Sequence, residues 1–159
     1  MKKAAIIQKI VSHLANELEL FHRAAKASFE EATDEQNKAE NKYDTRGLEA
    51  SYLARGQARQ VADTEQAIVQ FQSLPVVDFT ESSPINVGAL VSVESANTHQ
   101  WYFIGPSAGG TEIQNGKETV LVITPQSPLG RVLQGRKKGE VIRMGEGRTA
   151  RTQRILEVH

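Results

Sequence analysis

The chain has 159 residues, of which 39% are hydrophobic and 24% are charged, and its formal net charge at pH 7 is +0. These totals fit a folded protein of one ordinary domain or two small ones, and they exclude a disordered chain. The chain has no cysteine, which excludes a disulfide framework, a thiolate metal site and a cysteine nucleophile. The lack of cysteine suits a reducing cytoplasm, where we expect the protein to act, and no apolar run approaches the ~20 residues of a membrane span.

The first part of the chain, residues 1–74, contains no proline and predicts a helical domain. A heptad pattern with alternating spacings of four and three residues predicts a long helix that buries one stripe of side chains. The stripe contains Ile7, Val11, Leu14, Leu18, Phe21, Ala25, Ser28 and Ala32, of which Ser28 is the one polar member. Residues 33–42 are highly polar, and "YDTRG" (43–47) then interrupts the helical pattern.

A second helix is predicted over residues 48–74, with a weaker stripe. Its members are Ala54, Ala58, Val61, Ile68 and Phe71, with Glu65 intruding. Two long helices joined by a short break favour an antiparallel coiled-coil hairpin. A bundle is the alternative, but it requires a third or fourth helix that the sequence does not offer. The polar residues before the break predict that the far end of the hairpin projects into water.

The composition changes sharply at "SLPVVDFTESSPINVG" (73–88), which predicts a boundary between a helical domain (1–74) and a β domain (75–159). The β domain is expected to be a small antiparallel sheet with one short helix, so the fold class is α+β. Its candidate strands are 89–94, 101–104, 119–124, 140–144 and 153–158. An Asn-Gly pair within residues 114–117 predicts a tight hairpin turn.

The short helix is marked by residues that favour helix ends. Ser127 is a good N-cap and Pro128 a good first helical residue. Leu129 belongs to the apolar face of this helix, together with Val132 and Leu133, and Gly135 ends it.

No self-contained active site is apparent, so we expect that the protein is not an enzyme. The four histidines do not have the spacing of metal ligands, and no nucleophile elbow or Ser-His-Asp set is present. The loop "GPSAGG" (105–110) lacks the spacing and the Lys-Ser/Thr end of a phosphate-binding loop.

The zero net charge hides an asymmetry between the two parts of the chain. Acidic residues gather around the break between the helices: Glu30, Glu31, Asp34, Glu35, Glu40, Asp44 and Glu49. Basic residues gather near the C-terminus: Arg131, Arg136, Lys137, Lys138, Arg143, Arg148, Arg151 and Arg154. Either these are ordinary solvated surfaces, or the charges orient the protein in the field of a partner before contact.

A longer motif resembles a known family. "VITPQSPLGRVLQGRKKGEVI" (122–142) is similar to the C-terminal signature of the bacterial Gre transcript-cleavage factors. In that signature a strand runs into Ser-Pro-hydrophobic-Ala/Gly-Arg, a short helix, and a Gly-acid pair that opens the next strand. "INVGALVSVES" (85–95), "WYFIGP" (101–106) and "LEASYLARGQARQ" (48–60) resemble other parts of the family.

The resemblance implies an FKBP-like C-terminal domain that docks on bacterial RNA polymerase at the rim of its secondary channel. It places Ser127, Pro128, Leu129 and Arg131 at the docking surface. The Ser127-Pro128 pair forms a stiff corner in the backbone. Such a corner suits docking because a preorganised surface loses less entropy on binding.

The resemblance also implies that the hairpin enters the channel and that acids at its tip help to hold a Mg²⁺ of the polymerase during cleavage of backtracked nascent RNA. The protein would have no cofactor of its own. Aligned without a gap on Tyr52, "YDTRGLEASY" (43–52) puts Thr45 and Leu48 at the acidic positions. With one inserted residue the acids fall on Asp44 and Glu49, and Gly47 can absorb that residue at a turn. The alternative role of these two acids is to stabilise the start of the second helix.

Three other functions remain open. The protein could be a non-cleaving secondary-channel regulator that competes with Gre factors, as Rnk-type proteins do. It could be a prolyl isomerase, which the FKBP-like fold suggests, although the β domain has few aromatic residues: Phe79, Trp101, Tyr102 and Phe103. Its basic residues could also bind DNA weakly and without sequence preference. A monomer is expected, with no membrane partner.

Overall fold

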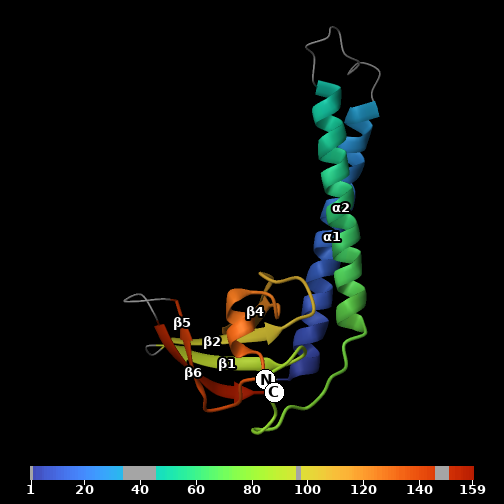
Figure 1. Ribbon diagram of the computed structural model, residues 1–159. Coiled ribbons are helices and arrows are strands. Elements are labelled where there is room, and N and C mark those ends of the chain that lie inside the picture. The colour runs from blue at the N-terminus through green and yellow to red at the C-terminus, as the bar shows by residue number, and fades with distance from the viewer. Residues whose placement is uncertain (1, 34–45, 96–97, 146–150) are drawn as a thin grey trace. The chain divides into compact units, whose positions relative to one another are not determined.

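The computed structural model describes residues 2–33, 46–95, 98–145 and 151–159, and it confirms the α+β class (Figure 1). The helices are α1 (Lys3–Thr33), α2 (Arg46–Gln72) and α3 (Pro128–Leu133). The strands are β1 (Leu90–Ser95), β2 (Thr98–Ile104), β3 (Glu112–Asn115), β4 (Glu118–Ile123), β5 (Val141–Met144) and β6 (Arg151–Val158). No helix in these four ranges is both long enough and apolar enough to cross a membrane.

The described residues divide into two compact units. One unit contains the sheet and consists of Met1–Val11 and Gln70–His159, and the other consists of Ser12–Val69. The first turns of α1 and the end of α2 thus belong to the unit of the sheet. The division into domains after residue 74, which the composition suggests, stays a prediction.

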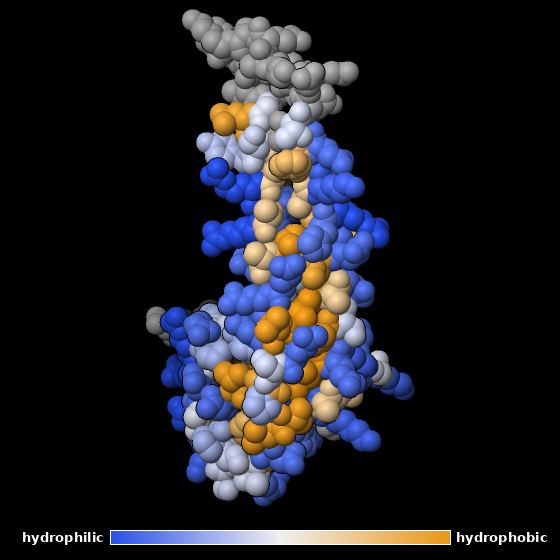
Figure 2. Space-filling view, turned by 90° about the vertical axis from the view of Figure 1, so that its right-hand side faces the viewer, coloured by the Kyte–Doolittle hydropathy of each residue, from blue (hydrophilic) through white to orange (hydrophobic). Residues whose placement is uncertain are grey.

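In the unit Ser12–Val69, α1 and α2 run antiparallel and side by side (Figure 1). The helix pair shows an apolar stripe between hydrophilic side chains (Figure 2). The expected stripe of α1 is confirmed at Leu14 and Ser28, which are both buried. One side-chain contact across the pair joins His22 Nε2 to a carboxylate oxygen of Glu65 at 3.6 Å.

The stripe of α2 differs from the predicted one. Ala58 is exposed. One row of buried or half-buried positions consists of Ala50, Ala54, Gln57, Val61, Thr64, Ile68 and Phe71, and Ala67 beside this row is also buried. This pattern again alternates spacings of four and three, but two of its members are polar. Thr64 tolerates burial because its Oγ1 donates to the carbonyl oxygen of Gln60 at 2.8 Å, within the helix. The apolar pattern therefore predicted Ala54, Val61, Ile68 and Phe71 correctly, was wrong at Ala58, and did not include the polar members Gln57 and Thr64.

The six strands form one sheet in the order β3-β4-β2-β1-β6-β5. Four of the five strand pairs are antiparallel, and β2 pairs with β4 in parallel, so the expectation of a purely antiparallel sheet was wrong. The loop 105–111 carries the chain past the position of β4 to the edge of the sheet. β3 forms there and the hairpin turn at Gly116 (φ +69°) returns the chain as β4. β3 was not among the predicted strands, although the Asn-Gly pair marks the turn that follows it.

Both faces of the central strands are buried. On one face α3 covers a core to which Val91, Val93, Ile104, Ile155 and Leu133 belong (Figure 1). Side chains in a strand alternate between the faces, so Leu90 and Phe103 point to the opposite side.

The second face is closed by the ends of the long helices within the same unit. The ring of Phe71, at the end of α2, lies 6.1 Å from the ring of Phe103 between centroids. Ile6 and Ile10 of α1 are fully buried in this unit. Lys9 Nζ donates to the carbonyl oxygen of Gln114 and to Asn115 Oδ1, both at 3.0 Å. Full burial of a side chain such as Phe71 stabilises the fold by about 1.5–3 kcal/mol.

Gly105 marks the closest approach on this second face. A Cβ added at Gly105 would lie 2.8 Å from Phe71 Cζ and 2.9 Å from Val122 Cγ1. We expect Gly105→Ala to lower the free energy of unfolding by about 1–3 kcal/mol, because the added methyl group overpacks the core. Urea denaturation followed by the fluorescence of Trp101 would measure this.

Gly56→Ala is the matched control. No atom lies within 4 Å of a Cβ added at Gly56, which is inside α2. Alanine should therefore stabilise the helix by about 0.5–1 kcal/mol. Equal effects of the two substitutions would contradict the close contact at Gly105.

Candidate functional site

The predicted helix start at Ser127 is confirmed, and it forms a tight corner after β4. Ser127 is the N-cap of α3, and its Oγ accepts a hydrogen bond from the Gly130 backbone N–H at 3.0 Å. The same hydroxyl donates to the carbonyl oxygen of Thr124 at 2.8 Å, and the Ser127 N–H donates to that oxygen at 3.0 Å. Pro128 follows as the first helical residue. Three hydrogen bonds therefore fix the direction in which the chain leaves the sheet.

Gly130 allows this helix to lie against the end of β4. A Cβ at this position would be 1.9 Å from the Thr124 carbonyl oxygen, a distance that no side chain can accommodate. Gly130 and Leu133 are the buried residues of α3. The helix ends at Gln134, and Gly135 (φ +79°) turns the chain away, as the sequence predicts.

The four residues predicted to dock lie together at this corner. Pro128 and Arg131 are exposed, whereas Ser127 and Leu129 are half-buried. Leu129 packs against the core of the sheet and so holds α3 on that face of the sheet. The α3 corner, which we define as Ser127, Pro128, Leu129 and Arg131, is therefore a rigid surface feature; its contact with a polymerase stays a prediction.

Two of the three basic residues that follow α3, Arg136 and Lys138, have carboxylate partners within the chain. Arg136 Nη1 lies 3.1 Å from Glu140 Oε2, and the backbone N–H of Lys137 donates to Glu140 Oε1 at 3.0 Å. Lys138 pairs with Glu81. Arg131, Arg143, Arg151 and Arg154 are also exposed, and Arg148 lies outside the described residues.

The two predicted tip acids are only partly described. Glu49 is exposed in the first turn of α2, where a carboxylate is favoured by the positive end of the helix dipole. Asp44 lies outside the described residues. Among residues 2–33, 46–95, 98–145 and 151–159, no group of three or more His, Cys, Asp or Glu side chains could hold a metal ion.

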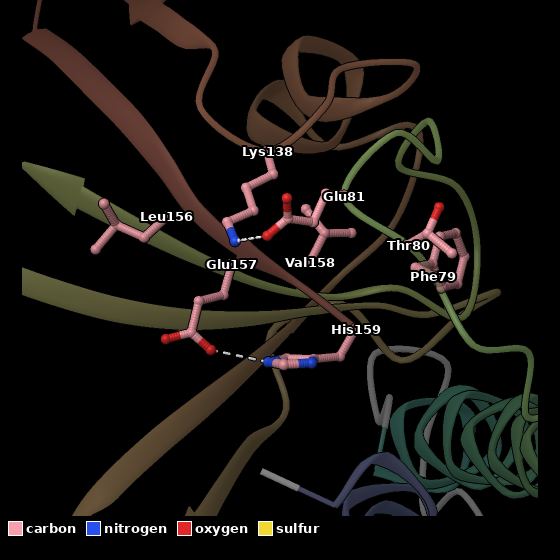
Figure 3. A pocket seen from close by; sticks show the side chains of 8 residues that line it. All are labelled: Phe79, Thr80, Glu81, Lys138, Leu156, Glu157, Val158 and His159. Carbon is pink, nitrogen blue, oxygen red and sulfur yellow. Dashed lines mark hydrogen bonds and ion pairs between the residues drawn. The ribbon is translucent and has the colours of Figure 1, made fainter.

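A surface cavity of about 640 Å³ is the site that sequence reasoning missed (Figure 3). It is lined by Phe79–Glu81, Lys138 and Leu156–His159. These segments lie far apart in the sequence and share no motif, so no spacing could have identified them. The nearest sequence indication was the basic run at 136–138, which ends at the cavity.

Two polar side-chain pairs line this cavity. Lys138 Nζ donates to Glu81 Oε1, and this hydrogen bond, followed by the lysine charge, lowers the pKa of the Glu81 carboxyl. His159 Nε2 lies 2.9 Å from Glu157 Oε2. The ring of His159 also stacks on Trp101, with centroids 5.9 Å apart. Each of the two carboxylates at the cavity, Glu81 and Glu157, therefore has a nitrogen partner within the chain.

Phe79 is held at the cavity by a buried lysine of α1. Lys3 Nζ donates to the Val77 carbonyl oxygen and lies 4.7 Å from the centroid of the Phe79 ring. Burial lowers the pKa of Lys3, although the Asp78 carboxylate acts in the opposite direction. The first turn of α1 therefore fixes the segment that forms one wall of the cavity.

The four aromatic residues considered for a prolyl isomerase site are spread over different surroundings. Trp101 and Phe103 alternate with Tyr102 along β2, so they point to the opposite face of the sheet. Of the four, Phe79 alone lines the cavity described above. Isomerase activity stays an untested alternative.

Removal of the N-cap tests the α3 corner. Ser127→Ala deletes both hydrogen bonds of the hydroxyl, and we expect the free energy of unfolding to fall by about 0.5–2 kcal/mol. Hydrogen exchange at the Gly130 amide should become faster. Ser12→Ala, at an exposed position inside α1, is the control and should leave this exchange unchanged. Unaltered exchange in Ser127→Ala would contradict the capping role.

No protein-family model and no curated protein matches the chain, whereas several solved structures do. The chain is similar to Gfh1 of Thermus aquaticus, at 19% identity and a TM-score of 0.40, over 93% of this chain and 92% of that one. It is similar to GreA factor homolog 1 (Gfh1) of Thermus thermophilus, at 19% identity and a TM-score of 0.36, over 94% of each chain. It is also similar to a prokaryotic transcription elongation factor GreA/GreB from Nitrosomonas europaea, at 17% identity and a TM-score of 0.37, over 60% of this chain and 78% of that one. These names belong to the family that the sequence motif resembles; the likeness is distant and assigns no role to any residue of this chain.

Proposed function

We propose that the protein is a transcription elongation factor that binds bacterial RNA polymerase at its secondary channel and promotes cleavage of backtracked RNA. It acts as an accessory factor to the hydrolytic activity of the polymerase. The α3 corner carries this proposal, because it combines the motif that resembles the Gre signature with a geometry suited to docking.

The geometry of the corner suits a contact surface in two ways. Its hydrogen bonds to Thr124 and the packing of Leu129 fix the backbone before any partner arrives, which reduces the entropy lost on binding. Pro128 and Arg131 are exposed, so an apolar ring and a guanidinium are both available to the partner. The nearby exposed cations would speed association with an acidic surface.

The helix pair would supply the cleavage function. Asp44 and Glu49 would offer carboxylate oxygens, the ligands that hard cations such as Mg²⁺ prefer. A Mg²⁺ bound there would lower the pKa of a water that attacks the RNA. The role of this chain is to present the carboxylates: Glu49 is exposed in the first turn of α2 and accessible to a partner.

One observation favours the second candidate, a regulator that occupies the channel without stimulating cleavage. Leu48 and Tyr52 flank Glu49 and are 56% and 64% exposed. Exposed apolar side chains of this size suit packing against a protein wall better than they suit metal binding. Such a protein would compete with authentic Gre factors for the same channel.

A transcript-cleavage assay on backtracked elongation complexes from the native host tests both candidates. We expect the protein to accelerate release of short 3′ RNA fragments. Asp44→Ala and Glu49→Ala should each reduce the rate by about tenfold or more, as the loss of a residue that supports a metal site does. Pro128→Ala should weaken polymerase binding several-fold, without loss of folding.

Two matched controls accompany these variants. Asp63→Ala removes an exposed carboxylate further along α2, and Pro84→Ala removes an exposed proline outside the α3 corner. Both should behave as the unmodified protein does. If the protein does not accelerate cleavage but inhibits an authentic Gre factor, and Pro128→Ala relieves the inhibition, the second candidate holds. No effect in either assay would refute docking at the channel.

A further inference from the structure

The outer edge of β6 is paired along only part of its length. β5 pairs with β6 from Arg151 to Arg154. The last backbone bonds on this side join Ile155 N to Glu140 O at 2.9 Å and Gly139 N to Ile155 O at 2.8 Å. Gly139 has a φ of +86°, a left-handed conformation that directs the chain away from β6. In the described part of the chain, no strand lies beside residues 156–158 on this side.

The open edge faces the cavity. His159 exchanges both of its backbone hydrogen bonds with Leu90 of β1, each at 2.9 Å. In an antiparallel ladder the backbone groups of successive residues point to alternate sides, so the N–H and C=O of Val158 point away from β1. Val158 lines the cavity. An open strand edge of this kind is a template for one more strand.

The side chains around this edge suit a peptide with a particular pattern. Phe79, Leu156 and Val158 give the cavity an apolar lining. At one end lies Lys138, whose carboxylate partner in the chain is Glu81 (Figure 3). The Glu81 side chain is 81% exposed, whereas that of Lys138 is 39% exposed. Water solvates such a carboxylate well, so a second carboxylate can replace it at little cost.

The turn that carries Glu81 is held by bonds that do not involve the Glu81 side chain. Glu81 lies in a turn in which the Ser83 N–H donates to the Thr80 carbonyl oxygen at 3.0 Å and Ser83 Oγ accepts from the Thr80 N–H at 2.9 Å. These bonds hold the turn together without Glu81. The carboxylate can therefore leave Lys138 while the wall of the cavity stays in place.

We propose that this cavity, which we call the β6 groove, binds an extended peptide segment of a partner protein that adds to β6 as a strand. The peptide carries an acidic side chain that replaces Glu81 at Lys138 and an apolar side chain that lies on Val158. The β6 groove is separate from the α3 corner, and the proposal does not depend on the transcription function.

The first test is fluorescence anisotropy with a fluorescein-labelled peptide of alternating valine and glutamate. Glu81→Gln should tighten binding several-fold, because Lys138 loses its internal partner. Lys138→Ala should weaken binding by about tenfold, as expected for the loss of one charge-assisted hydrogen bond. Lys137→Ala removes the same charge from the neighbouring exposed position and should leave binding within about twofold of the unmodified protein.

The second test separates strand addition from simple charge attraction. The same peptide with alternate amide nitrogens methylated keeps its side chains but cannot donate to the edge, and it should not bind. In an amide NMR spectrum of the full chain, the unmethylated peptide should shift the Val158 resonance. Equal binding of the methylated peptide would overturn the proposal, and so would shifts confined to α3. Failure of the Glu81→Gln protein to bind up to about 1 mM would overturn it too. Tighter binding of a single-stranded oligonucleotide than of the peptide would assign the groove to nucleic acid instead.

Discussion

Both faces of the sheet carry apolar side chains that have to be shielded from water. The elements packed on each face are determined by this requirement. α3 has six residues and covers one face together with the segment before β1, to which Phe79 and Ile85 belong. The other face carries Leu90 and Phe103, which would be exposed without the ends of α1 and α2. Phe71 and Ile10 meet this need within the sheet unit. The first turns of α1 and the end of α2 are therefore part of the core of the sheet unit.

One segment, residues 124–139, determines both surfaces discussed above. Its first part turns tightly under the Thr124 carbonyl, where only glycine fits at position 130, and this presents the α3 corner. In its last part, Gly139 is bonded to β6 but the residues before Gly139 are turned away from that strand. The edge of β6 is therefore open there, and Lys138 lines the groove. The close contact at Gly130 and the turn at Gly139 thus allow a short stretch of chain to form two separate surfaces that share no side chains.

The features that sequence predicted well are those that local chemistry decides. The α3 corner follows from the capping hydroxyl of Ser127 and the ring of Pro128, which need no distant residue. The parallel pairing of β2 with β4 depends on the course of the loop 105–111, not on the strand residues, so alternation could not reveal it. The β6 groove was missed because its walls come from segments that meet only in the folded chain. The position of Glu49 at a helix start was predictable from the break at 43–47, whereas Asp44 lies outside the described residues.

The composition of the sheet unit from two separate stretches has a consequence for the order of folding. Its contacts join residues far apart in the chain, such as Lys9 with Gln114, 105 positions away. Bringing such residues together is slow, because the intervening chain loses entropy before any contact forms. The helix pair consists of the residues between the two stretches and pairs through nearer neighbours. Early pairing of α1 with α2 would bring the ends of Met1–Val11 and Gln70–His159 close together. It would thereby lower the entropy lost when the sheet unit assembles.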